Sequence, residues 1–242
     1  MDESQSRQKA LITGASSGIG KETALAFAKA GVDLALVGRS QEKLDAVISE
    51  VKQYSVSVQS YQIDLAATET VKDKIKDVVA DFGGVDILVN NAGMGYTNPL
   101  SETPLEEWEQ VLNLNLTSVF QCIQGVLPTM RDRARGTIIN IASIAAHSPF
   151  PTWGAYSVSK AGIITLSKAL SGEEKENGIR VVTITPGAVN TPLWDSDTVQ
   201  MELNRDAMLD PKVVAQTIVQ AALLPQQAVI EEMTLMPSAG AL

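Results

Sequence analysis

Residues 9–31 read K-A-L-I-T-G-A-S-S-G-I-G-K-E-T-A-L-A-F-A-K-A-G. The apolar run at 9–13 predicts a short buried strand, and the alanine-rich run after the glycines predicts a helix. Between them Gly14, Gly18 and Gly20 predict a tight turn that presents backbone N–H groups and a helix N-terminus to a phosphate. The spacing is G-x-x-x-G-x-G instead of the commoner G-x-G-x-x-G. Its place at the first strand–helix junction nevertheless favours a dinucleotide site over an ordinary turn.

Strands and helices continue to alternate along the rest of the chain. The further expected strands are 32–37, 56–63, 85–89, 137–142, 179–185 and 228–235. The further expected helices are 41–53, 68–82, 105–130, 155–171 and 211–224. With no linker, repeat or low-complexity stretch, this order predicts one α/β domain over residues 1–242, a Rossmann-like doubly wound fold whose parallel sheet is flanked by helices on both faces. Residues 1–8 form a polar tail, and the irregular stretch 188–210 is long enough to be a substrate loop or lid.

Polar and small residues stand at the carboxyl ends of the predicted strands. Ligands of doubly wound sheets bind beyond these ends, at the point where the strand order reverses. The Gly14 turn, Arg39, Asp64, Asn90 and Ser143 all fall there, and this coincidence indicates a single site. After the second strand an acidic residue would favour NAD, whereas an arginine accommodates a 2′-phosphate. Because Arg39 stands there without a neighbouring carboxylate, we expect NADP(H) as the cofactor.

Tyr156 and Lys160 stand four residues apart in a segment whose apolar residues have helical spacing. We therefore expect them one turn apart on the same helix face. An ammonium beside a phenol favours the phenolate, which should lower the pKa of Tyr156 from about 10 towards neutrality. A tyrosine tuned in this way can give or take a proton at working pH. Ser143 follows the strand-like run T-I-I-N-I-A, so its hydroxyl should emerge at a strand end.

The composition argues against several classes of function. The 242 residues include 19 basic and 28 acidic side chains, and the net charge of −9 argues against nucleic acid or an anionic membrane as a partner. No apolar run approaches the ~20 residues of a membrane span, and the polar N-terminus is neither a signal nor a transit peptide. The single cysteine, Cys122, lies in an apolar helix-like run and cannot form an internal disulfide. We therefore expect a cytoplasmic protein with a structural thiol and no metal site.

Taken together, these motifs resemble those of the classical short-chain dehydrogenase/reductase (SDR) family along nearly the whole chain. The matching residues are T-G-A-S-S-G-I-G at 13–20, N-N-A-G at 90–93, Asn115 within N-L-N-L-T-S-V-F, Ser143, Y-S-V-S-K at 156–160, and P-G at 186–187 followed by Thr191. Their order and spacing fit, including the thirteen residues from Ser143 to Tyr156. The resemblance implies a nicotinamide cofactor and hydride transfer between a carbonyl compound and an alcohol.

The resemblance also implies roles for four candidate catalytic residues. Tyr156 would act as the general acid/base that protonates the carbonyl oxygen, and Ser143 would hydrogen-bond the same oxygen. Lys160 would hold the ribose hydroxyls of the cofactor and depress the pKa of Tyr156. Asn115 would bend its helix locally and hold a water that relays protons towards Lys160.

For the cofactor, the resemblance implies a cradle made of the glycine turn and the neighbouring strand ends. Its expected members are Gly14, Ser16, Ser17, Gly18, Ile19, Gly20, Arg39, Ser40, Asp64, Leu65, Asn91, Ala92, Gly93, Tyr156, Lys160, Pro186, Gly187, Val189 and Thr191. The expected substrate contacts are Met94, Ser143, Trp153, Tyr156 and Trp194, with His147, Phe150 and Leu193 bordering the same pocket. This set is mostly apolar, so we expect a small hydrophobic carbonyl or alcohol substrate. No catalytic role is expected of His147, because Tyr156 already supplies the proton.

Two departures from the family pattern bear on function. Ser17 stands where many NADP-using relatives carry a basic residue, so Arg39 would have to recognise the phosphate largely alone. The chain ends in E-E-M-T-L-M-P-S-A-G-A-L and lacks the G-Q-x-x-x-V-D-G-G-like strand of reductases that act on acyl-carrier-protein thioesters. This ending is more similar to that of members acting on small 3-hydroxy acids, ketones or aldehydes.

The function expected from the sequence is therefore that of an NADP-dependent short-chain alcohol dehydrogenase or carbonyl reductase. Two alternatives stay open, a 3-oxoacyl-[acyl-carrier-protein] reductase and a catalytically silent NADP-sensing regulator. A nucleotide-sugar epimerase is disfavoured, because the chain is short and lacks a G-x-x-G-x-x-G loop. By resemblance, the helices at 105–130 and 155–171 would pack against a second copy and give a homodimer or homotetramer.

Overall fold

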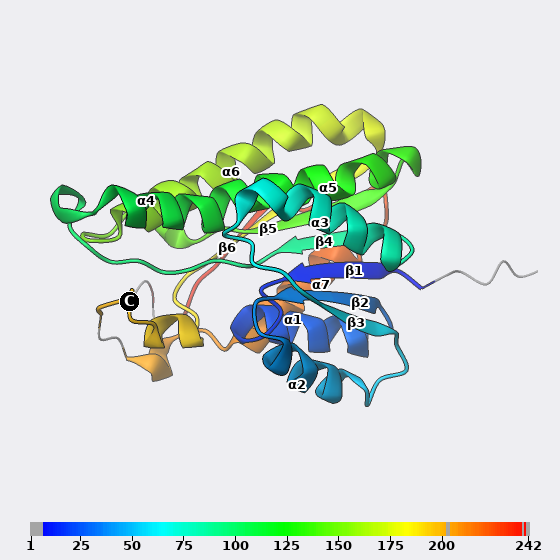
Figure 1. Cartoon of the computed structure of the whole chain (residues 1–242), viewed down its shortest axis with the longest axis horizontal. Coiled ribbons are helices and arrows are strands. Elements are labelled where there is room, and N and C mark those ends of the chain that lie inside the picture. The colour runs from blue at the N-terminus through cyan, green and yellow to red at the C-terminus, as the bar shows by residue number, and fades with distance from the viewer. Residues whose placement is uncertain (1–6, 202–203, 239, 241–242) are drawn as a thin grey trace, which may run out of the picture.

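A seven-stranded parallel sheet forms the centre of the computed structural model, which describes residues 7–201, 204–238 and 240 (Figure 1). The strands are β1 Lys9–Thr13, β2 Asp33–Gly38, β3 Val58–Gln62, β4 Ile87–Asn90, β5 Gly136–Ile141, β6 Ile179–Pro186 and β7 Glu232–Leu235. Their order in the sheet is β3-β2-β1-β4-β5-β6-β7, so the direction of winding reverses between β1 and β4. This topology confirms the doubly wound α/β fold and places the ligand crevice at the carboxyl ends of β1 and β4.

Helices cover both faces of the sheet (Figure 1). They are α1 Gly18–Lys29, α2 Gln41–Val51, α3 Thr68–Asp81, α4 Leu105–Leu112, α5 Ser118–Asp132, α6 Gly154–Glu174 and α7 Pro211–Ala222. Successive strand residues point to opposite faces and divide the core in two. Leu11 and Leu88 pack with residues of α3, α5 and α6, whereas Ile12 and Val89 pack with residues of α1, α2 and α7. Both faces are therefore apolar, as a buried parallel sheet requires.

Two expected elements differ most in the structure, whereas the bounds of the others shift by no more than three residues. The single helix expected at 105–130 is two helices, α4 and α5, joined by the π-helical turn Asn113–Thr117. The turn places Asn115 opposite the backbone of Met94, whose N–H and C=O both bond to its amide. The last strand, expected from residue 228, begins only at Glu232, because a turn in which the Ala228 N–H bonds to the Pro225 carbonyl precedes it.

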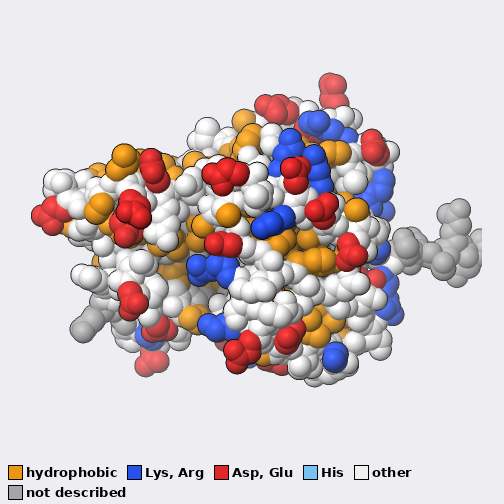
Figure 2. All heavy atoms as spheres, viewed as in Figure 1, with side chains coloured by type: hydrophobic (Ala, Val, Ile, Leu, Met, Phe, Trp, Pro, Cys, Tyr) orange, Lys and Arg blue, Asp and Glu red, His pale blue; other side chains and the backbone are white. Residues whose placement is uncertain are grey.

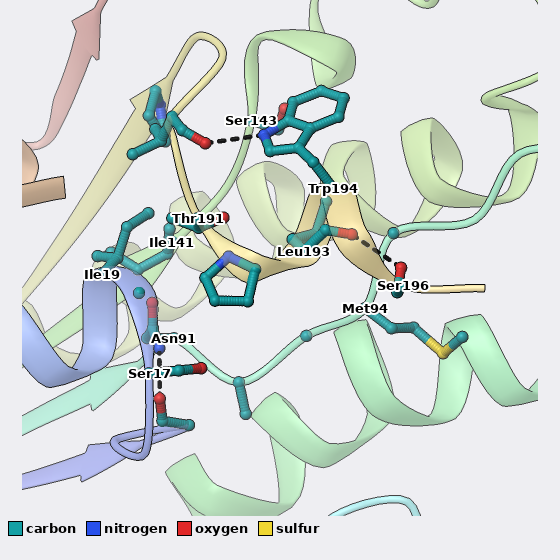
Figure 3. Close-up of a pocket in the computed structure, with 18 of the residues that line it drawn as sticks. Ser17, Ile19, Asn91, Met94, Ile141, Ser143, Thr191, Leu193, Trp194 and Ser196 are labelled. Atoms are coloured by element: carbon teal, nitrogen blue, oxygen red, sulfur yellow. Dashed lines mark hydrogen bonds between the residues drawn. The ribbon is translucent and has the colours of Figure 1, made fainter. Parts of the chain in front are cut away.

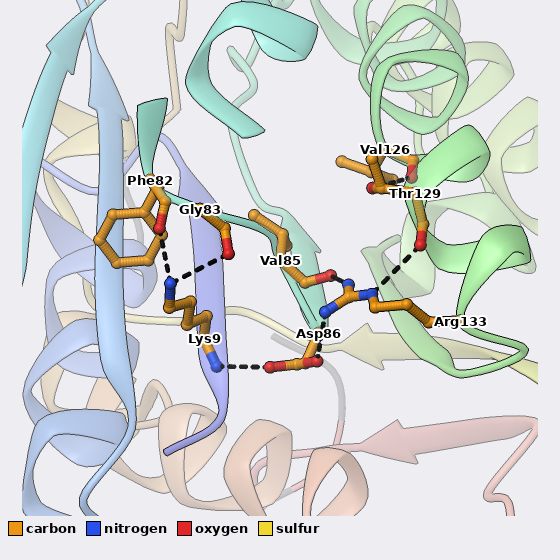
Figure 4. A network of polar contacts seen from close by, with 8 residues as sticks. All are labelled: Lys9, Phe82, Gly83, Val85, Asp86, Val126, Thr129 and Arg133. Carbon is orange, nitrogen blue, oxygen red and sulfur yellow. Dashed lines mark hydrogen bonds and ion pairs between the residues drawn. The ribbon is translucent and has the colours of Figure 1, made fainter. Parts of the chain in front are cut away.

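Asp86 anchors the edge of the sheet that lies opposite the crevice (Figure 4). Its Oδ2 accepts a hydrogen bond from the Lys9 backbone N–H at 2.9 Å, and its Oδ1 accepts one from Arg133 Nη1 at 3.0 Å. Arg133 also bonds to the backbone carbonyls of Thr129 and Val85. One carboxylate thus ties the start of β1 to the end of α5 and the entry of β4. On the side shown in Figure 2, other charged side chains of both signs are interspersed over the surface.

Asp86→Ala should lower the free energy of unfolding by about 1–3 kcal/mol, because it leaves the Lys9 N–H without this acceptor and removes the ion pair with Arg133. The Asp86 side chain is only 18% exposed, whereas that of Asp73, which pairs with Lys76 on the surface of α3, is 81% exposed. Asp73→Ala is therefore the matched control and should change stability by no more than about 0.5 kcal/mol. Urea denaturation of both variants measures the difference, and equal losses would contradict the role given to Asp86.

Candidate active site

A cavity of about 730 Å³ lies over the carboxyl ends of β1, β2, β4, β5 and β6 (Figure 3). Most residues expected at the site line it. They are Gly14, Ser16, Ser17, Gly18, Ile19, Arg39, Ser40, Leu65, Asn91, Ala92, Gly93, Met94, Ser143, Phe150, Trp153, Tyr156, Lys160, Pro186, Gly187, Val189, Thr191, Leu193 and Trp194. Residues that are far apart in the sequence therefore meet in one cavity, because the parallel strands end at the same edge.

Five of the expected residues do not line the cavity, and one of them, Asn90, is buried in the sheet, where its amide bonds to Asn140. The Asp64 carboxylate accepts the Ala66 N–H at 3.0 Å and closes a local turn. His147 points to the surface, where its Nε2 lies 2.9 Å from Glu232 Oε1. Gly20 and Asn115 lie behind the wall and support it. The expectation that His147 borders the pocket is therefore not met, and the expected contacts of Asp64 and Gly20 with the cofactor stay predictions that the cavity lining does not support.

The glycine turn packs directly against the end of β4. Gly14 has a φ of +64°, and a Cβ there would lie 2.8 Å from Ala92 Cα. A Cβ on Gly20 would lie 2.2 Å from the Gly14 carbonyl oxygen, so both positions require glycine. Asn91 Nδ2 holds the turn by donating to the carbonyls of Thr13 and Gly14, at 3.1 and 3.2 Å. The N-terminus of α1 thereby faces the cavity, an arrangement that suits a phosphate.

A second cation lines the cavity together with Arg39, which follows β2. It is Lys43, in the first turn of α2. The Ser40 hydroxyl caps α2 by accepting the Lys43 N–H at 3.3 Å. Neither the Arg39 nor the Lys43 side chain forms an ion pair with any residue that the structure describes. The sequence analysis missed Lys43, although its place in the first turn of a capped helix was a usable signal, since helical side chains lean towards the N-terminus. Arg39 is thus not alone at this end.

Lys160 is almost completely buried at the reactive end of the cavity. Its Nζ donates to the backbone carbonyl of Ile141 at 2.9 Å and lies 5.8 Å from the centre of the Tyr156 ring. Burial disfavours the charged ammonium and lowers the pKa of Lys160 to about 8. The helix face shared by Tyr156 and Lys160 confirms the prediction made from their spacing.

The direction of the Tyr156 pKa differs from the prediction. Burial raises the pKa of Tyr156, and the hydrogen bond with the Ser143 hydroxyl lowers it by less. The expectation that Lys160 depresses this pKa is not met, because the Lys160 ammonium is directed at the Ile141 carbonyl and is itself destabilised by burial. In this structure Tyr156 is therefore held as a neutral phenol beside Ser143.

Asn115 braces the wall behind these groups. Its Oδ1 accepts the Met94 N–H at 2.8 Å, and its Nδ2 donates to the Met94 carbonyl at 3.0 Å and to Ser159 Oγ at 3.1 Å. Ser159 Oγ in turn donates to the Tyr156 carbonyl at 2.6 Å. The π-helical turn around Asn115 confirms the expected local bend. Both Nδ2 hydrogens are used and Oδ1 already accepts the Met94 N–H, and the expected relay water stays a prediction.

Three aromatic rings form a wall at the other side of the reactive end. The Trp153 and Tyr156 rings meet edge to face at 5.2 Å, and Trp153 and Trp194 do so at 5.6 Å. The Trp194 indole is fixed by a 2.8 Å hydrogen bond from Nε1 to the Val189 carbonyl (Figure 3). Leu193 and Met94 add apolar surface, so this part of the cavity suits an apolar ligand.

The loop 188–210 lies over the cavity and is fastened to the segment after β4. Thr198 Oγ1 donates to the Gly95 carbonyl at 2.7 Å, and the Thr198 carbonyl accepts the Thr97 N–H at 2.9 Å. Short 3₁₀ turns at Pro192–Asp195 and Arg205–Ala207 replace the irregular backbone expected there. The sequence analysis did not name four lining residues of this region, Ala188, Pro192, Ser196 and Met201, nor Met236 after β7. Residues 202–203 of the loop lie outside the described part.

The family model described as "short chain dehydrogenase" matches residues 8–202. The chain belongs to this family. Among curated SDR relatives, 3-oxoacyl-[acyl-carrier-protein] reductase FabG of Staphylococcus epidermidis is 40% identical over 183 residues, 75% of each chain. An uncharacterized oxidoreductase of Staphylococcus saprophyticus, SSP0419, is 34% identical over 229 residues, 94% of this chain and 96% of the relative.

Solved SDR structures cover nearly the whole chain. An alcohol dehydrogenase from the archaeon Thermococcus sibiricus, complexed with 5-hydroxy-NADP, has a TM-score of 0.87 and 29% identity, covering 96% of this chain and 97% of the other. A metagenomic short-chain oxidoreductase in complex with NADP has a TM-score of 0.83, with the same identity and coverage.

Three further features concern the described residues of this SDR protein. None of their helices is long and apolar enough to cross a membrane. No group of His, Cys, Asp and Glu side chains among them could hold a metal ion. Burial raises the pKa of the Cys122 thiol to about 12, which suits the structural role expected for it.

The buried Lys160 should make the stability of this SDR protein depend on pH. Below pH 8 the native state must bury a charged ammonium, whereas between pH 8 and 10.5 only the unfolded state stays protonated, so stability rises with pH in this window. Lys160→Met removes this penalty. The stability advantage of the variant over the wild type should therefore shrink by roughly 3 kcal/mol between pH 8 and 10.5. Urea unfolding across this pH range measures the stability difference between Lys160→Met and the wild type. Lys52→Met, at an exposed position, is the control. A stability difference for Lys160→Met that does not change with pH would contradict burial of the charge.

Proposed function

We propose that the protein is an NADP(H)-dependent oxidoreductase that interconverts a ketone or aldehyde and an alcohol. The proposal rests on one observation: Ser143, Tyr156 and Lys160 line one end of a cavity, and Arg39 and Lys43 line its other end. A proton donor, an oxygen ligand and a phosphate-binding end thereby share one continuous space.

The cavity fits a dinucleotide along its length. The glycine turn and the N-terminus of α1 would receive the pyrophosphate, since a Cβ at Gly14 would close the approach. Arg39 and Lys43 would bind a 2′-phosphate, and the NADP named with two similar SDR structures supports this choice. Lys160 would hold the nicotinamide ribose, with Thr191 at the carboxamide. When bound, the cofactor donates or accepts the hydride.

The remaining chemistry is the transfer of one proton at the substrate oxygen. Ser143 would donate a hydrogen bond to the carbonyl oxygen, and the Tyr156 O–H would protonate this oxygen as the alcohol forms. The raised pKa of Tyr156 keeps the phenol protonated in the free protein. Because reduction consumes a proton from this phenol, the protonated state supports reduction. Oxidation would require the phenolate and is favoured by more alkaline conditions.

The substrate end favours an uncharged, hydrophobic carbonyl compound. Its wall is formed by Met94, Trp153, Leu193 and Trp194. The Lys and Arg side chains among the described lining residues are Arg39 and Lys43 at the adenosine end, and Lys160. A substrate carboxylate would find no further cation, and burying it unpaired is costly. We therefore infer a ketone or aldehyde rather than a 3-hydroxy acid.

A 3-oxoacyl-[acyl-carrier-protein] reductase is the second candidate. The observation in its favour is the 40% identity with a FabG relative over three quarters of the chain. Against it stands the C-terminal segment, which lacks the expected signature and places Met236 in the cavity wall. A silent NADP sensor is less favoured, because the complete set of candidate catalytic residues is present.

We also infer a cytoplasmic homo-oligomer, a dimer or tetramer, as the family resemblance implies. Leu105, Phe120 and Val158 are exposed on α4, α5 and α6, the helices expected to meet a second copy. Such apolar side chains on adjacent helices support the inference.

The decisive experiment follows NADPH oxidation by absorbance with hydrophobic ketones, aldehydes, 3-oxo acids and 3-oxoacyl thioesters. Neutral ketones or aldehydes should be turned over best, and Tyr156→Phe should lower kcat by roughly 10²- to 10⁴-fold while NADPH still binds. Turnover of 3-oxoacyl thioesters alone would move the protein to the second candidate. Full activity of Tyr156→Phe would refute the role of the phenol, and tight NADPH binding without turnover of any compound would favour the sensor.

Cofactor choice should depend on Arg39 and Lys43 together. Arg39→Asp should weaken NADPH binding by roughly 10- to 100-fold and Lys43→Ala by roughly tenfold, because each removes a charge-assisted bond to the 2′-phosphate. NADH binding should change by less than about threefold, since NADH lacks this group. Fluorescence titration measures both, with Lys52→Ala, at the opposite end of α2, as the control. Unchanged NADPH affinity in both variants would place phosphate recognition elsewhere.

A further inference from the structure

A chain of three buried polar side chains runs from the sheet into α6. Asn90 Nδ2 on β4 donates to Asn140 Oδ1 on β5 at 2.8 Å, and Asn140 Nδ2 donates to Ser167 Oγ on α6 at 2.9 Å. Ser167 completes the chain by donating to the Ile163 carbonyl of its own helix at 2.7 Å. All three side chains are at least 97% buried. Because Asn140 Oδ1 faces Asn90, its Nδ2 has to face α6.

This chain lies where apolar residues would be expected. Leu88 and Ile138, two residues earlier on the same strands, pack into the apolar core on the same face. Asn90 Oδ1 accepts no hydrogen bond from any residue that the structure describes. A buried acceptor without a partner destabilises a fold, so stability alone does not explain these amides. Residues that break a local rule in this way often serve the site.

The chain meets α6 close to Lys160. Ser167 follows Lys160 by seven residues, two helical turns, and lies on the same buried face. Its partner Asn140 directly precedes Ile141, whose carbonyl accepts the Lys160 ammonium. Two neighbouring residues of β5 therefore each receive one polar contact from α6. Together these contacts set the position of the helix along the strand.

Other contacts of α6 do not define this position as sharply. Ile163 and Ile164 contribute apolar contacts, which are not directional and tolerate a small slide. At the far end of the helix the buried Glu174 pairs with Arg131 of α5, so α6 is already attached to the protein without Ser167. The bond from Asn140 to Ser167 is directional and lies between this attachment and the reactive end.

We propose that Asn140 and Ser167, oriented by Asn90, are positioning residues that hold α6 at the height where Lys160 reaches the Ile141 carbonyl and Tyr156 faces Ser143. The inference rests on the proposed function only in the roles given to Tyr156 and Lys160. It goes beyond that function in assigning the placement of both groups to a polar chain outside the cavity.

The test compares Ser167→Ala with Ser118→Ala. Ser118 is also a buried serine that bonds to the carbonyl four residues earlier, Leu114, but it has no side-chain partner among the described residues. Lysine NMR, with the Lys160 signal assigned through Lys160→Arg, follows the titration of Lys160 in the free protein. Steady-state kinetics with NADPH and the best carbonyl substrate gives kcat and KM, and urea unfolding gives stability.

We expect Ser167→Ala to raise the pKa of Lys160 from about 8 towards the ordinary value of a lysine, because a displaced helix exposes the ammonium. Its kcat should fall roughly tenfold, with KM and the NADPH dissociation constant within about twofold. Asn140→Ala, which removes the donor instead, should have the same effects, and Ser167→Thr, which keeps the hydroxyl, should restore both values. Ser118→Ala should lose stability with the Lys160 titration and kcat unchanged.

A wild-type titration of Lys160 in Ser167→Ala and Asn140→Ala would overturn the proposal, and so would equal changes in Ser118→Ala. The NMR titration needs no substrate. If the wild type reduces no carbonyl compound, the proposed function fails while the titration still decides whether Ser167 positions Lys160.

Discussion

The parallel pairing of β1 with both β2 and β4 is the constraint on which the site depends. It brings the carboxyl ends of all these strands to one edge and opens a crevice where the winding reverses. The glycine turn can enter this crevice only because Gly14 and Gly20 lack side chains, since a Cβ on either would collide with backbone atoms. The sheet topology alone then places three features around one cavity: the strand ends, the N-terminus of α1 and the first two turns of α6.

A second constraint is the burial of Lys160. An ammonium with one backbone acceptor in an apolar surrounding is unfavourable, and the lowered pKa of Lys160 expresses this cost. The fold accepts it because the same burial removes water from Tyr156 and strengthens each polar contact that a ligand makes there. Sites that carry out proton transfer commonly have groups whose pKa values are shifted in this way. The reactive end of the cavity is therefore a local weakness in stability that the two apolar cores offset.

The sequence predicted the elements that are marked by local signals. β1 was expected at 9–13 and begins and ends there, because an apolar run meets a glycine turn at its boundary. The catalytic candidates were found because their types and spacing are distinctive. Two features were missed since they arise only from tertiary contacts: the raised pKa of Tyr156, and the bond between Asn140 and Ser167. The bend at Asn115 was expected only through the family resemblance, since its contact with Met94 is also tertiary. The four-residue spacing suggested that the Lys160 ammonium would lower the pKa of Tyr156. In the fold this ammonium instead donates to the carbonyl of Ile141 on β5.

The two ends of the cavity explain why the relatives agree on the family and differ in their substrates. The cofactor end is built on strand ends and helix N-termini, whose geometry follows from the sheet itself. The substrate end is built on connecting segments, with Met94 after β4, Trp153 before α6 and Trp194 in the loop 188–210. Such segments vary without disturbing the fold, so a shared fold supports the reaction type more strongly than it supports a substrate. The substrate has to be argued from the wall itself. Two indoles and a phenol packed edge to face, with no cation beyond Lys160 on that side among the described residues, favour a neutral, apolar carbonyl compound over a charged one.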